Sequence, residues 1–472
     1  MPWNGLASRD RLRRWTARRA LRTLMSLHAA ALAAARRLGS RRPAASRNGQ
    51  CTILLTGTFY SQNWVAAQLR PLAASSRCAR IYLVSTQSVP RVAKVVAIHP
   101  PPWLCRILGD VPARLVVFAC TALRVRPHII GGFHLLVNGL LAAFLAPLVG
   151  ARSMYICTGG PLEIIDGGVW AENRLFAKLG TPDTIVERRL LRAAREFDLL
   201  IVRGERTRRF FRGVGVGAPI HVVTGGVDAH RFSPSGEAPA FDLILVGRLT
   251  AVKRVDVFLR AVQTVARELP AVSACVVGGG PLLDQLEKLA AELGIADRVR
   301  FVGHQDDVER WLRRARIFVL TSDNEGLALS LIEAMLCGLP AIVSDVGELG
   351  DLVATGLNGY RVSPGCPEAF AARIVELLAN PQKLATLSAQ ARTTALQFDV
   401  HPVSRKWADV LVHACGASVG ARPLRRALVR DTTCHDPDAP DVQEIDGEDQ
   451  RVCVNGDMSG LRAPPRAVGR RA

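Results

Sequence analysis

The chain has 472 residues, of which 49% are apolar and 22% are charged, with ordinary numbers of glycine and proline. This composition excludes collagen, a continuous coiled coil and a chain that is disordered throughout, and the length predicts two domains with separate cores. The formal net charge is +20, yet residues 1–50 contain twelve Arg and a single acid. Because nucleic-acid enzymes usually spread basic residues over their folded surface, this concentration at one end argues against a nucleic-acid partner.

Residues 1–50 form a basic extension, within which residues 9–37 have the spacing of one helix with two different faces. A basic amphipathic helix suits an anionic membrane surface, and we favour this hypothesis. A targeting peptide and a solvated extension stay open as alternatives. The basic face contains Arg11, Arg14, Arg18 and Arg22, and the mostly apolar face contains Leu21, Leu24, Met25, His28 and Leu32.

The eleven cysteines are odd in number, scattered, and never arranged as C-x-x-C. This pattern predicts neither a disulfide framework nor a structural zinc site, and it favours a reducing compartment. Together with the basic helix, it predicts a cytoplasmic protein that is peripheral on the cytoplasmic face of a membrane.

From Cys51 the sequence alternates between short apolar runs and helix-like stretches, which predicts a parallel sheet with right-handed crossovers. The alternation starts again in the second half, so we expect two similar α/β domains, at 51–222 and 223–417. The strands expected in the first domain cover residues 51–58, 80–85, 114–120, 126–134, 153–160 and 197–204. Those expected in the second domain cover residues 241–249, 273–281, 299–304, 316–322 and 341–345.

Two segments depart from this alternation. The apolar run at 135–150 has only 16 residues and is interrupted by Asn138 and Pro147. It is therefore short for a bilayer span of about 20 residues and predicts a buried crossover helix. Residues 418–472 combine an acidic stretch with Arg-rich ends and little apolar periodicity, which predicts a disordered tail.

The segment TSDNEGLALSLIEAMLCGLP at 321–340 is the most informative for function. It predicts a buried strand, a polar turn and a helix that starts near Gly326, whose N-terminus would face the crevice where open α/β sheets bind ligands. Glu325 and Glu333 are eight residues apart, which is about 12 Å along such a helix. Two carboxylates at one glycosidic bond are about 5–9.5 Å apart. The spacing therefore suits contacts with two parts of an extended ligand.

Five elements, taken in order, resemble the family 4 retaining glycosyltransferases (glycosyl transferases group 1). Segment 325–333 reads E-G-x-x-x-S-x-x-E and is similar to the family's E-x7-E signature. GRLTAVKRVD at 247–256 resembles its G-R-L-x-x-x-K-G element, and TGGVDAHRFSP at 224–234 resembles the start of its second domain. The strands within 276–304 and the segment 346–362 match as well. The resemblance implies the GT-B fold, in which two Rossmann-like domains face each other across a cleft.

The resemblance also implies a role for each matching residue. Arg248 and Lys253 would hold the diphosphate of a nucleotide-sugar donor, Glu325 would contact the transferred sugar, Glu333 the nucleotide ribose, and His134 would lie in the cleft. Basic side chains can stabilise a departing diphosphate without a metal, so we expect no metal and no cofactor. The implied site residues are Glu325 and His134 at the reacting sugar and Arg248, Lys253, Gly326, Leu327 and Glu333 around the donor.

The sequence therefore predicts an enzyme that transfers a sugar from a nucleotide-diphosphate sugar to a glycan or lipid-linked acceptor with retention of configuration, in polysaccharide or glycolipid biosynthesis. A nucleotide-sugar epimerase, which would use the same donor without an acceptor, is the nearest enzymatic alternative. A non-catalytic scaffold that binds membrane or nucleic acid through residues 1–50 is the alternative of another class. A dehydrogenase is disfavoured because GGGP at 278–281 lacks the third glycine of a dinucleotide fingerprint.

Overall fold

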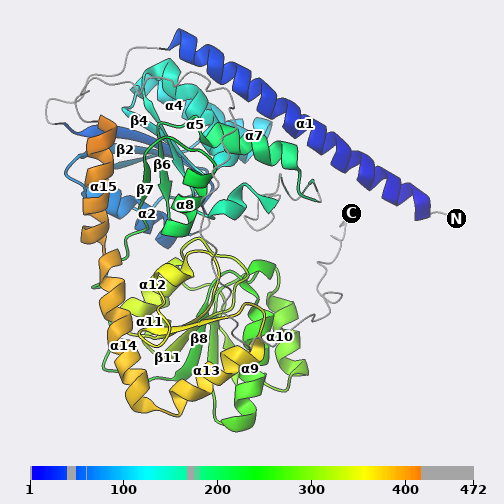
Figure 1. The fold of residues 1–472 in the computed structure, drawn as a ribbon, viewed down its shortest axis with the longest axis vertical. Helices are drawn as coiled ribbons and strands as arrows, with labels where there is room; N and C mark the ends of the chain where they lie inside the picture. The colour runs from blue at the N-terminus through cyan, green and yellow to red at the C-terminus, as the bar shows by residue number, and fades with distance from the viewer. Residues whose placement is uncertain are drawn as a thin grey trace, which may run out of the picture. The chain divides into compact units, whose positions relative to one another are not determined.

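A computed structural model describes residues 3–39, 49–59, 61–166, 176, 178–179 and 181–415. The predicted disordered tail at 418–472 lies outside the described residues. The described chain contains two α/β domains, each built around its own parallel sheet (Figure 1). This architecture confirms the predicted fold class.

The first domain contains a sheet of seven parallel strands in the order β3-β2-β1-β4-β5-β6-β7. Its strands are β1 (Cys51–Thr56), β2 (Cys78–Val84), β3 (Val95–Ile98), β4 (Ile129–Phe133), β5 (Arg152–Ile156), β6 (Leu199–Val202) and β7 (Ile220–Val222). Its helices are α1 (Trp3–Leu38), α2 (Gln62–Ala74), α3 (Pro102–Leu108), α4 (Asp110–Val125), α5 (Leu140–Val149), α7 (Thr184–Ala194) and α8 (Glu205–Gly213), with the short turns η1 (Leu135–Gly139) and η2 (Pro161–Glu163).

The second domain contains a sheet of six parallel strands in the order β10-β9-β8-β11-β12-β13. Its strands are β8 (Phe241–Val246), β9 (Ala274–Val277), β10 (Val299–Phe301), β11 (Ala315–Leu320), β12 (Ala341–Ser344) and β13 (Gly359–Val362). The helices that follow in the chain are α9 (Val255–Glu268), α10 (Leu283–Glu292), α11 (Val308–Leu312), α12 (Leu329–Leu336), α13 (Pro367–Leu378), α14 (Pro381–Ala395) and α15 (Val400–Cys415), with the turns η4 (Ala251–Lys253), η5 (Leu349–Asp351) and η6 (Leu396–Phe398).

Helices cover both faces of each sheet, which is why the strands are nearly continuous apolar runs. In the first domain, α2 and α15 pack on one face, and α4, α5 and α7 cover the other. In the second domain, α12 covers one face, and α9 and α13 cover the other. Within each sheet, all strands run parallel to one another. Their carboxyl ends therefore collect the loops that carry the candidate site.

The prediction of a strand at 114–120 is wrong, because these residues belong to helix α4. The buried residues of α4 include Ala113, Phe118 and Ala122, which recur at helical spacing. A continuous apolar run reads equally well as a buried strand or as part of a buried helix, and its periodicity alone does not separate the two. The strands predicted in the second domain are confirmed.

The apolar run at 135–150 forms η1 and α5, which lie buried between the first sheet and the helices around it. The predicted buried crossover helix is therefore confirmed. Among the described helices, none combines the length and the apolarity that crossing a bilayer requires.

Helix α1 lies along α5 and α7 of the first domain (Figure 1). Leu21, Met25 and Leu32 are buried in this packing, and Arg22 forms an ion pair with Asp183 at 2.8 Å. The apolar face that the sequence analysis assigned to a membrane is therefore largely used within the protein. The basic face is partly used as well, since Arg22 is one of its members.

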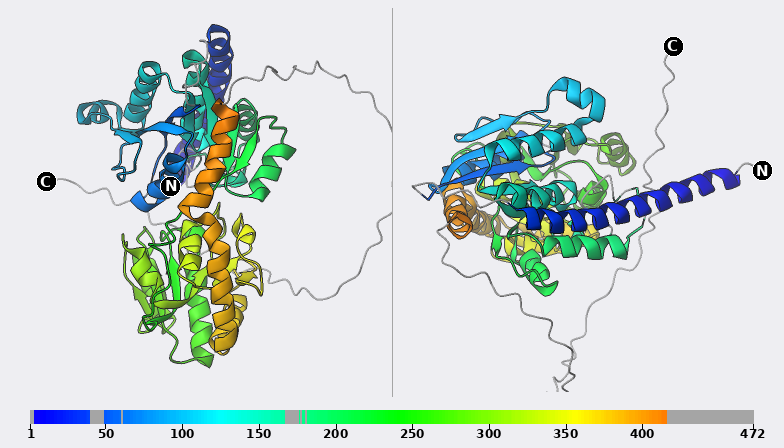
Figure 2. Two further views of the ribbon diagram at one scale, coloured as in Figure 1. Left: turned by 90° about the vertical axis from the view of Figure 1, so that its left-hand side faces the viewer. Right: turned by 90° about the horizontal axis from the view of Figure 1, so that it is seen from above.

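The last helix, α15, returns to the first domain and packs against α2 (Figure 2). Trp407 and Leu411 belong to the same apolar cluster as the residues of β1. A disulfide joins Cys51, at the start of β1, to Cys415, at the end of α15, across 364 residues of sequence. This bond contradicts the expectation drawn from cysteine spacing, because a pair so distant in sequence has no spacing signature. Cysteine usage therefore no longer favours a reducing compartment.

Replacing Trp407 with Ala should lower the free energy of unfolding by about 3–5 kcal/mol, because its indole is 3% exposed and fills the contact between α15 and the first sheet. The control is Val412→Ala on the same helix, where the side chain is 45% exposed and the loss should stay near about 0.5 kcal/mol. Urea denaturation followed by circular dichroism measures both. Equal losses in the two variants would contradict the packing of α15.

Candidate active site

Two loops of the second domain, one after β8 and one after β11, bring an ammonium and a carboxylate together. Lys253 Nζ donates a hydrogen bond to Oε1 of Glu325 at 2.5 Å, and Ser322 Oγ donates to the same oxygen at 2.7 Å. The two charged side chains are 19% and 10% exposed, so their attraction is screened less than it would be at an open surface. The structure thus joins two residues that the sequence analysis placed at the diphosphate and at the sugar.

The same two loops are tied together by their backbones. The amide of Asp323 donates to the carbonyl of Val252 at 2.9 Å, and Thr321 Oγ1 donates to the carbonyl of Arg254 at 2.8 Å. Arg254 stands where the resembled element has glycine, and its φ of +45° lies in the left-handed region that favours glycine. Ion pairs to Asp256 at 3.0 Å and Asp323 at 3.3 Å hold it there. These contacts therefore fix the backbone next to Lys253.

Helix α12 begins at Leu329, three residues later than the sequence predicts, so Glu325 and Gly326 lie in the loop before it. The helical estimate of the distance between the two signature glutamates therefore does not apply. A Cβ on Gly326 would lie 2.0 Å from the carbonyl oxygen of Thr158 in the first domain. Only glycine fits this contact, which brings the loop of Glu325 against the first domain.

Arg248 and Leu327 complete the residues predicted around the donor. Arg248 lies two residues after the end of β8 and is exposed, and its carbonyl accepts a hydrogen bond from the amide of Thr250 at 2.9 Å. Leu327 is partly buried and packs against the core beneath α12. Arg248 is therefore an exposed residue on the loop that also carries Lys253.

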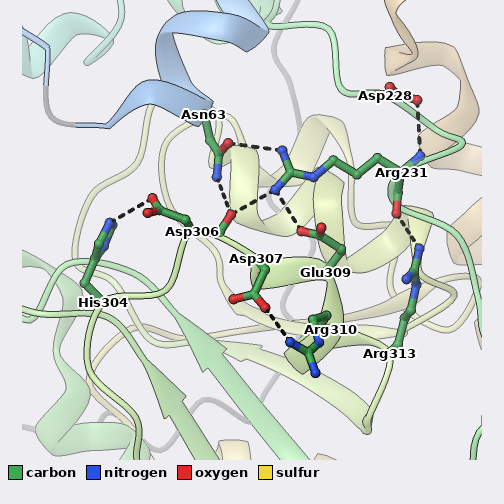
Figure 3. Close-up of polar contacts among 9 residues, drawn as sticks. All are labelled: Asn63, Asp228, Arg231, His304, Asp306, Asp307, Glu309, Arg310 and Arg313. Carbon is green, nitrogen blue, oxygen red and sulfur yellow. Dashed lines mark hydrogen bonds and ion pairs between the residues drawn. The ribbon is translucent and has the colours of Figure 1, made fainter. Parts of the chain in front are cut away.

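Glu333, on α12, has different charged neighbours from those of Glu325. Burial raises the pKa of Glu333 to about 7, with Arg231 lowering it and Glu309 raising it by less. Arg231 pairs with Glu309 at 2.9 Å and donates to Oδ1 of Asn63 at 3.2 Å (Figure 3). Asn63 belongs to α2 of the first domain, so this cluster is a second contact between the domains. Asn63, Arg70 and Arg231 line a small pocket together with Glu333.

In the first domain, His134 lies directly after β4 and faces the loop after β5. Its Nδ1 is 3.1 Å from Thr158 Oγ1 and 3.4 Å from a carboxylate oxygen of Glu163. Glu163 is 5% exposed and accepts hydrogen bonds from the amides of Leu135 at 2.8 Å and of Thr158 and Gly159 at 3.1 Å. The carboxylate is therefore fixed in position beside the imidazole.

Glu163 is stabilised in its ionised form despite its position in the interior. Burial raises its pKa, but His134 and the amides of Gly159 and Leu135 together lower it by more, so the pKa lies below the ordinary value. A fixed carboxylate beside an imidazole orients the ring. Because Thr158 contacts both His134 and Gly326, this pair adjoins the loop of Glu325.

A third contact joins the domains at the N-terminus of α8. The carboxylate of Glu348 accepts hydrogen bonds from the amides of Arg206 at 3.2 Å and Thr207 at 2.8 Å, which neutralises donors that a helix N-terminus leaves unpaired. The amide of Glu348 in turn donates to the carbonyl of Gly326 at 3.1 Å. The contact therefore continues into the loop that carries Glu325.

Sequence reasoning missed Ser322, Glu163 and Glu348. A signal for Glu163 was present, because it is a carboxylate three residues after the T-G-G turn at 158–160, which the sequence already places at the end of a strand. No local signal could identify Glu348, because the helix that it caps lies 141 residues away in the sequence.

Comparison with known proteins finds a family match within the second domain. Residues 228–394 match the profile of the family described as glycosyl transferases group 1. The D-inositol 3-phosphate glycosyltransferase of Thermobispora bispora is 35% identical over 218 residues, which cover 41% of this chain and 50% of that protein. The GDP-mannose-dependent alpha-(1-6)-phosphatidylinositol monomannoside mannosyltransferase of Mycolicibacterium smegmatis is 28% identical over 228 residues. These residues cover 44% of this chain and 60% of that protein. The chain thus spans about half the length of the curated relatives that it matches.

Solved structures show the fold of both domains. Anabaena HepE in complex with UDP and glucose superposes with a TM-score of 0.61 at 20% identity, covering 77% of this chain and 100% of that one. Sucrose-phosphate synthase from Thermosynechococcus elongatus superposes with a TM-score of 0.64 at 19% identity. The match covers 78% of this chain and 100% of that one. The chain therefore has the GT-B fold.

Replacing Glu333 with Gln should stabilise the protein more at about pH 8 than at about pH 5. The raised pKa means that the folded state binds the proton more tightly than the unfolded state. The stability that this proton contributes is complete below the unfolded value of 4.5 and is lost as the pH rises through about 7. The stability of the variant relative to the natural protein should therefore rise by about 1–3 kcal/mol between the two pH values.

Chemical denaturation at both pH values measures this difference. The control is Glu368→Gln, an exposed residue of α13, which should show no pH dependence. A Glu333→Gln effect that is the same at both pH values would show that the carboxylate is ionised in the folded protein across this range.

Proposed function

We propose that this chain, whose residues 228–394 match the glycosyl transferases group 1 family, is a retaining glycosyltransferase. The proposed reaction transfers a sugar from a nucleotide-diphosphate sugar to a glycan or lipid-linked acceptor. The observation that carries the proposal is the contact of Lys253 with Glu325 on loops at the carboxyl ends of two strands.

In the proposed complex, the two basic residues of the loop after β8 bind the donor diphosphate. Arg248 can form a bidentate contact with phosphate oxygens, and Lys253 adds a compact charge beside it. Negative charge grows on the diphosphate as the glycosidic bond breaks, so these cations stabilise the transition state more than the ground state. Glu325, released from Lys253, then accepts hydrogen bonds from hydroxyls of the transferred sugar, and Glu333 accepts them from the nucleotide ribose.

Retention follows if the acceptor attacks from the face that the diphosphate leaves. The bond between the anomeric carbon and the phosphate oxygen breaks, the acceptor oxygen bonds to the same carbon, and its proton passes to the departing diphosphate oxygen. This route needs positioning and preorganised charge rather than a strong protein base. His134, oriented by Glu163, would hydrogen-bond the reacting sugar.

We propose that the reaction needs no metal, because the cations that would balance the diphosphate charge are Arg248 and Lys253. In the described part of the chain, no three His, Cys, Asp or Glu side chains are grouped as metal ligands would be. The metal-free reaction is tested directly below by chelation.

For the acceptor, we propose a glycolipid or a polysaccharide precursor at the cytoplasmic face of an anionic membrane. One relative is named for inositol 3-phosphate and another for a phosphatidylinositol mannoside, which supports a polyol or lipid-linked acceptor. Donor identity is tested by thermal-shift measurements against UDP-, GDP- and ADP-sugars, because a ligand that binds only the folded state raises Tm by mass action. A donor that is converted without any acceptor would favour the epimerase alternative.

Replacing Arg248 or Lys253 with Ala should reduce kcat/KM at least about 100-fold, because each variant loses about 3–4 kcal/mol of transition-state stabilisation at the leaving group. The control is Arg260→Ala on the exposed face of α9, which should leave kcat/KM unchanged. Initial rates with the donor found by thermal shift measure all three. A loss below tenfold in both site variants would mean that the diphosphate is bound elsewhere.

The proposed route leads to three further predictions. Activity should persist in EDTA, the anomeric configuration of the product should match that of the donor, and intact-mass spectra should show no sugar attached to the protein. Chelation assays, NMR of the product and mass spectrometry measure them in turn. An inverted product would refute the retaining assignment, whereas an adduct on Glu325 would refute only the direct route.

A further inference from the structure

Helices α3 and α4 carry an unusual concentration of exposed apolar side chains. Of the fifteen large apolar residues that are exposed in the described chain, six lie on these two helices, and only two lie between residues 223 and 399. Trp103 and Ile107 are 60% and 71% exposed, and Leu123 is 58% exposed. The six residues are Trp103, Ile107, Leu108, Val111, Val116 and Leu123. We call them the α3–α4 surface.

The exposed apolar residues follow the helical repeat. Trp103 and Ile107 lie one turn apart on α3, and Val116 and Leu123 lie two turns apart on α4. The opposite face of α4, including Phe118, is buried against the sheet. Figure 2 shows both helices, in light blue to cyan, at the outer margin of the first domain. The α3–α4 surface therefore consists of apolar side chains on two neighbouring helices that the described chain leaves exposed.

The charge around this surface is almost entirely positive. Residues 85–127 contain five Arg and one Lys against a single acid, Asp110. Arg91, Arg106, Arg124 and Arg126 are all exposed. Exposed apolar side chains that include a tryptophan, together with exposed arginines on the same segment, are the composition that binds at the interface of an anionic bilayer.

The position of the surface also suits an acceptor that arrives from a membrane. Helix α3 begins four residues after the carboxyl end of β3, an edge strand of the first sheet. On the inner side of α4, Arg114 donates to Thr56 Oγ1 at 2.9 Å and to Thr58 Oγ1 at 3.4 Å. Thr56 ends β1, so α4 connects the exposed surface to the carboxyl edge of the sheet, where the candidate active site lies.

A second copy of the chain is a poorer occupant of this surface. A symmetric dimer brings the same patch of each subunit together, so the exposed arginines of one copy would face those of the other. Like charges brought together at an interface oppose association. An anionic lipid surface meets the same patch with opposite charge.

We propose that the α3–α4 surface docks the protein on an anionic lipid bilayer, with Trp103 and Ile107 inserted at the interface. The inference rests on the proposed function only in that the membrane would then be the source of the lipid-linked acceptor. It assigns the main apolar contact to α3 and α4 rather than to α1, where Leu21, Met25 and Leu32 pack within the protein and five other large apolar residues are exposed.

The test measures binding of the full chain to vesicles of phosphatidylcholine with about 30 mol% phosphatidylglycerol. The variant Trp103→Gln with Ile107→Gln should need at least about tenfold more lipid for half-maximal binding, because it loses the two most exposed apolar contacts without changing the charge. Two matched pairs serve as controls, Leu357→Gln with Leu396→Gln in the second domain and Leu12→Gln with Trp15→Gln on α1. Both control pairs should bind vesicles within about threefold of the natural protein.

Hydrogen exchange of the natural protein provides a measurement that needs no variant. Amides of residues 102–125 should gain protection when vesicles are added, and those of 349–362 should not. Unchanged vesicle binding of the Trp103→Gln and Ile107→Gln variant would overturn the proposal, as would equal losses in either control pair. A change of oligomeric mass in that variant, with vesicle binding intact, would identify a self-association surface instead.

The outcome is independent of the proposed chemistry. The donor-induced rise in Tm should be the same in the natural protein and in the Trp103→Gln and Ile107→Gln variant, because neither residue belongs to the candidate active site. If no nucleotide sugar raises Tm in either protein, the proposed function fails while the vesicle measurement still decides the docking surface.

Discussion

The ion pair between Lys253 and Glu325 is the interaction on which the candidate active site depends. It joins loops from two strands of one sheet and pairs two partly shielded charges. An unpaired charge at that depth would be costly, so each residue stabilises the other. A donor would supply a new partner for each, a diphosphate for Lys253 and sugar hydroxyls for Glu325, and the exchange would leave neither charge unpaired.

The first domain fixes a second carboxylate close to this pair. Glu163 is held by three backbone amides and orients His134, and Thr158 connects His134 to Gly326. The two halves of the site therefore meet through backbone contacts as well as side chains. Further contacts at Glu348 and at Arg231 join other elements of the two domains. Such preorganisation suits a reaction in which charge is stabilised by fixed groups rather than by rearrangement.

Much of this arrangement could be predicted, and the failures have physical causes. The parallel sheets and the residues of the second domain followed from apolar runs and from the motif at 325–333, because both are local in sequence. The strand expected at 114–120 failed because a continuous apolar run has no distinguishing period. Three features could not be predicted because each depends on a partner far away in the sequence. They are the contacts of Glu348, the disulfide between Cys51 and Cys415, and the burial of Leu21, Met25 and Leu32 on α1.

The most direct test of the central claim is calorimetric titration of the nucleoside diphosphate of the true donor into three proteins: the natural chain, Lys253→Met and Glu325→Gln. If Lys253 is held by Glu325 until the diphosphate arrives, Lys253→Met should raise Kd at least about tenfold, through loss of a charge-assisted contact. Glu325→Gln should bind the diphosphate as tightly as the natural protein or more tightly, because the ammonium no longer has to leave a carboxylate. An equal loss of affinity in both variants would contradict the account.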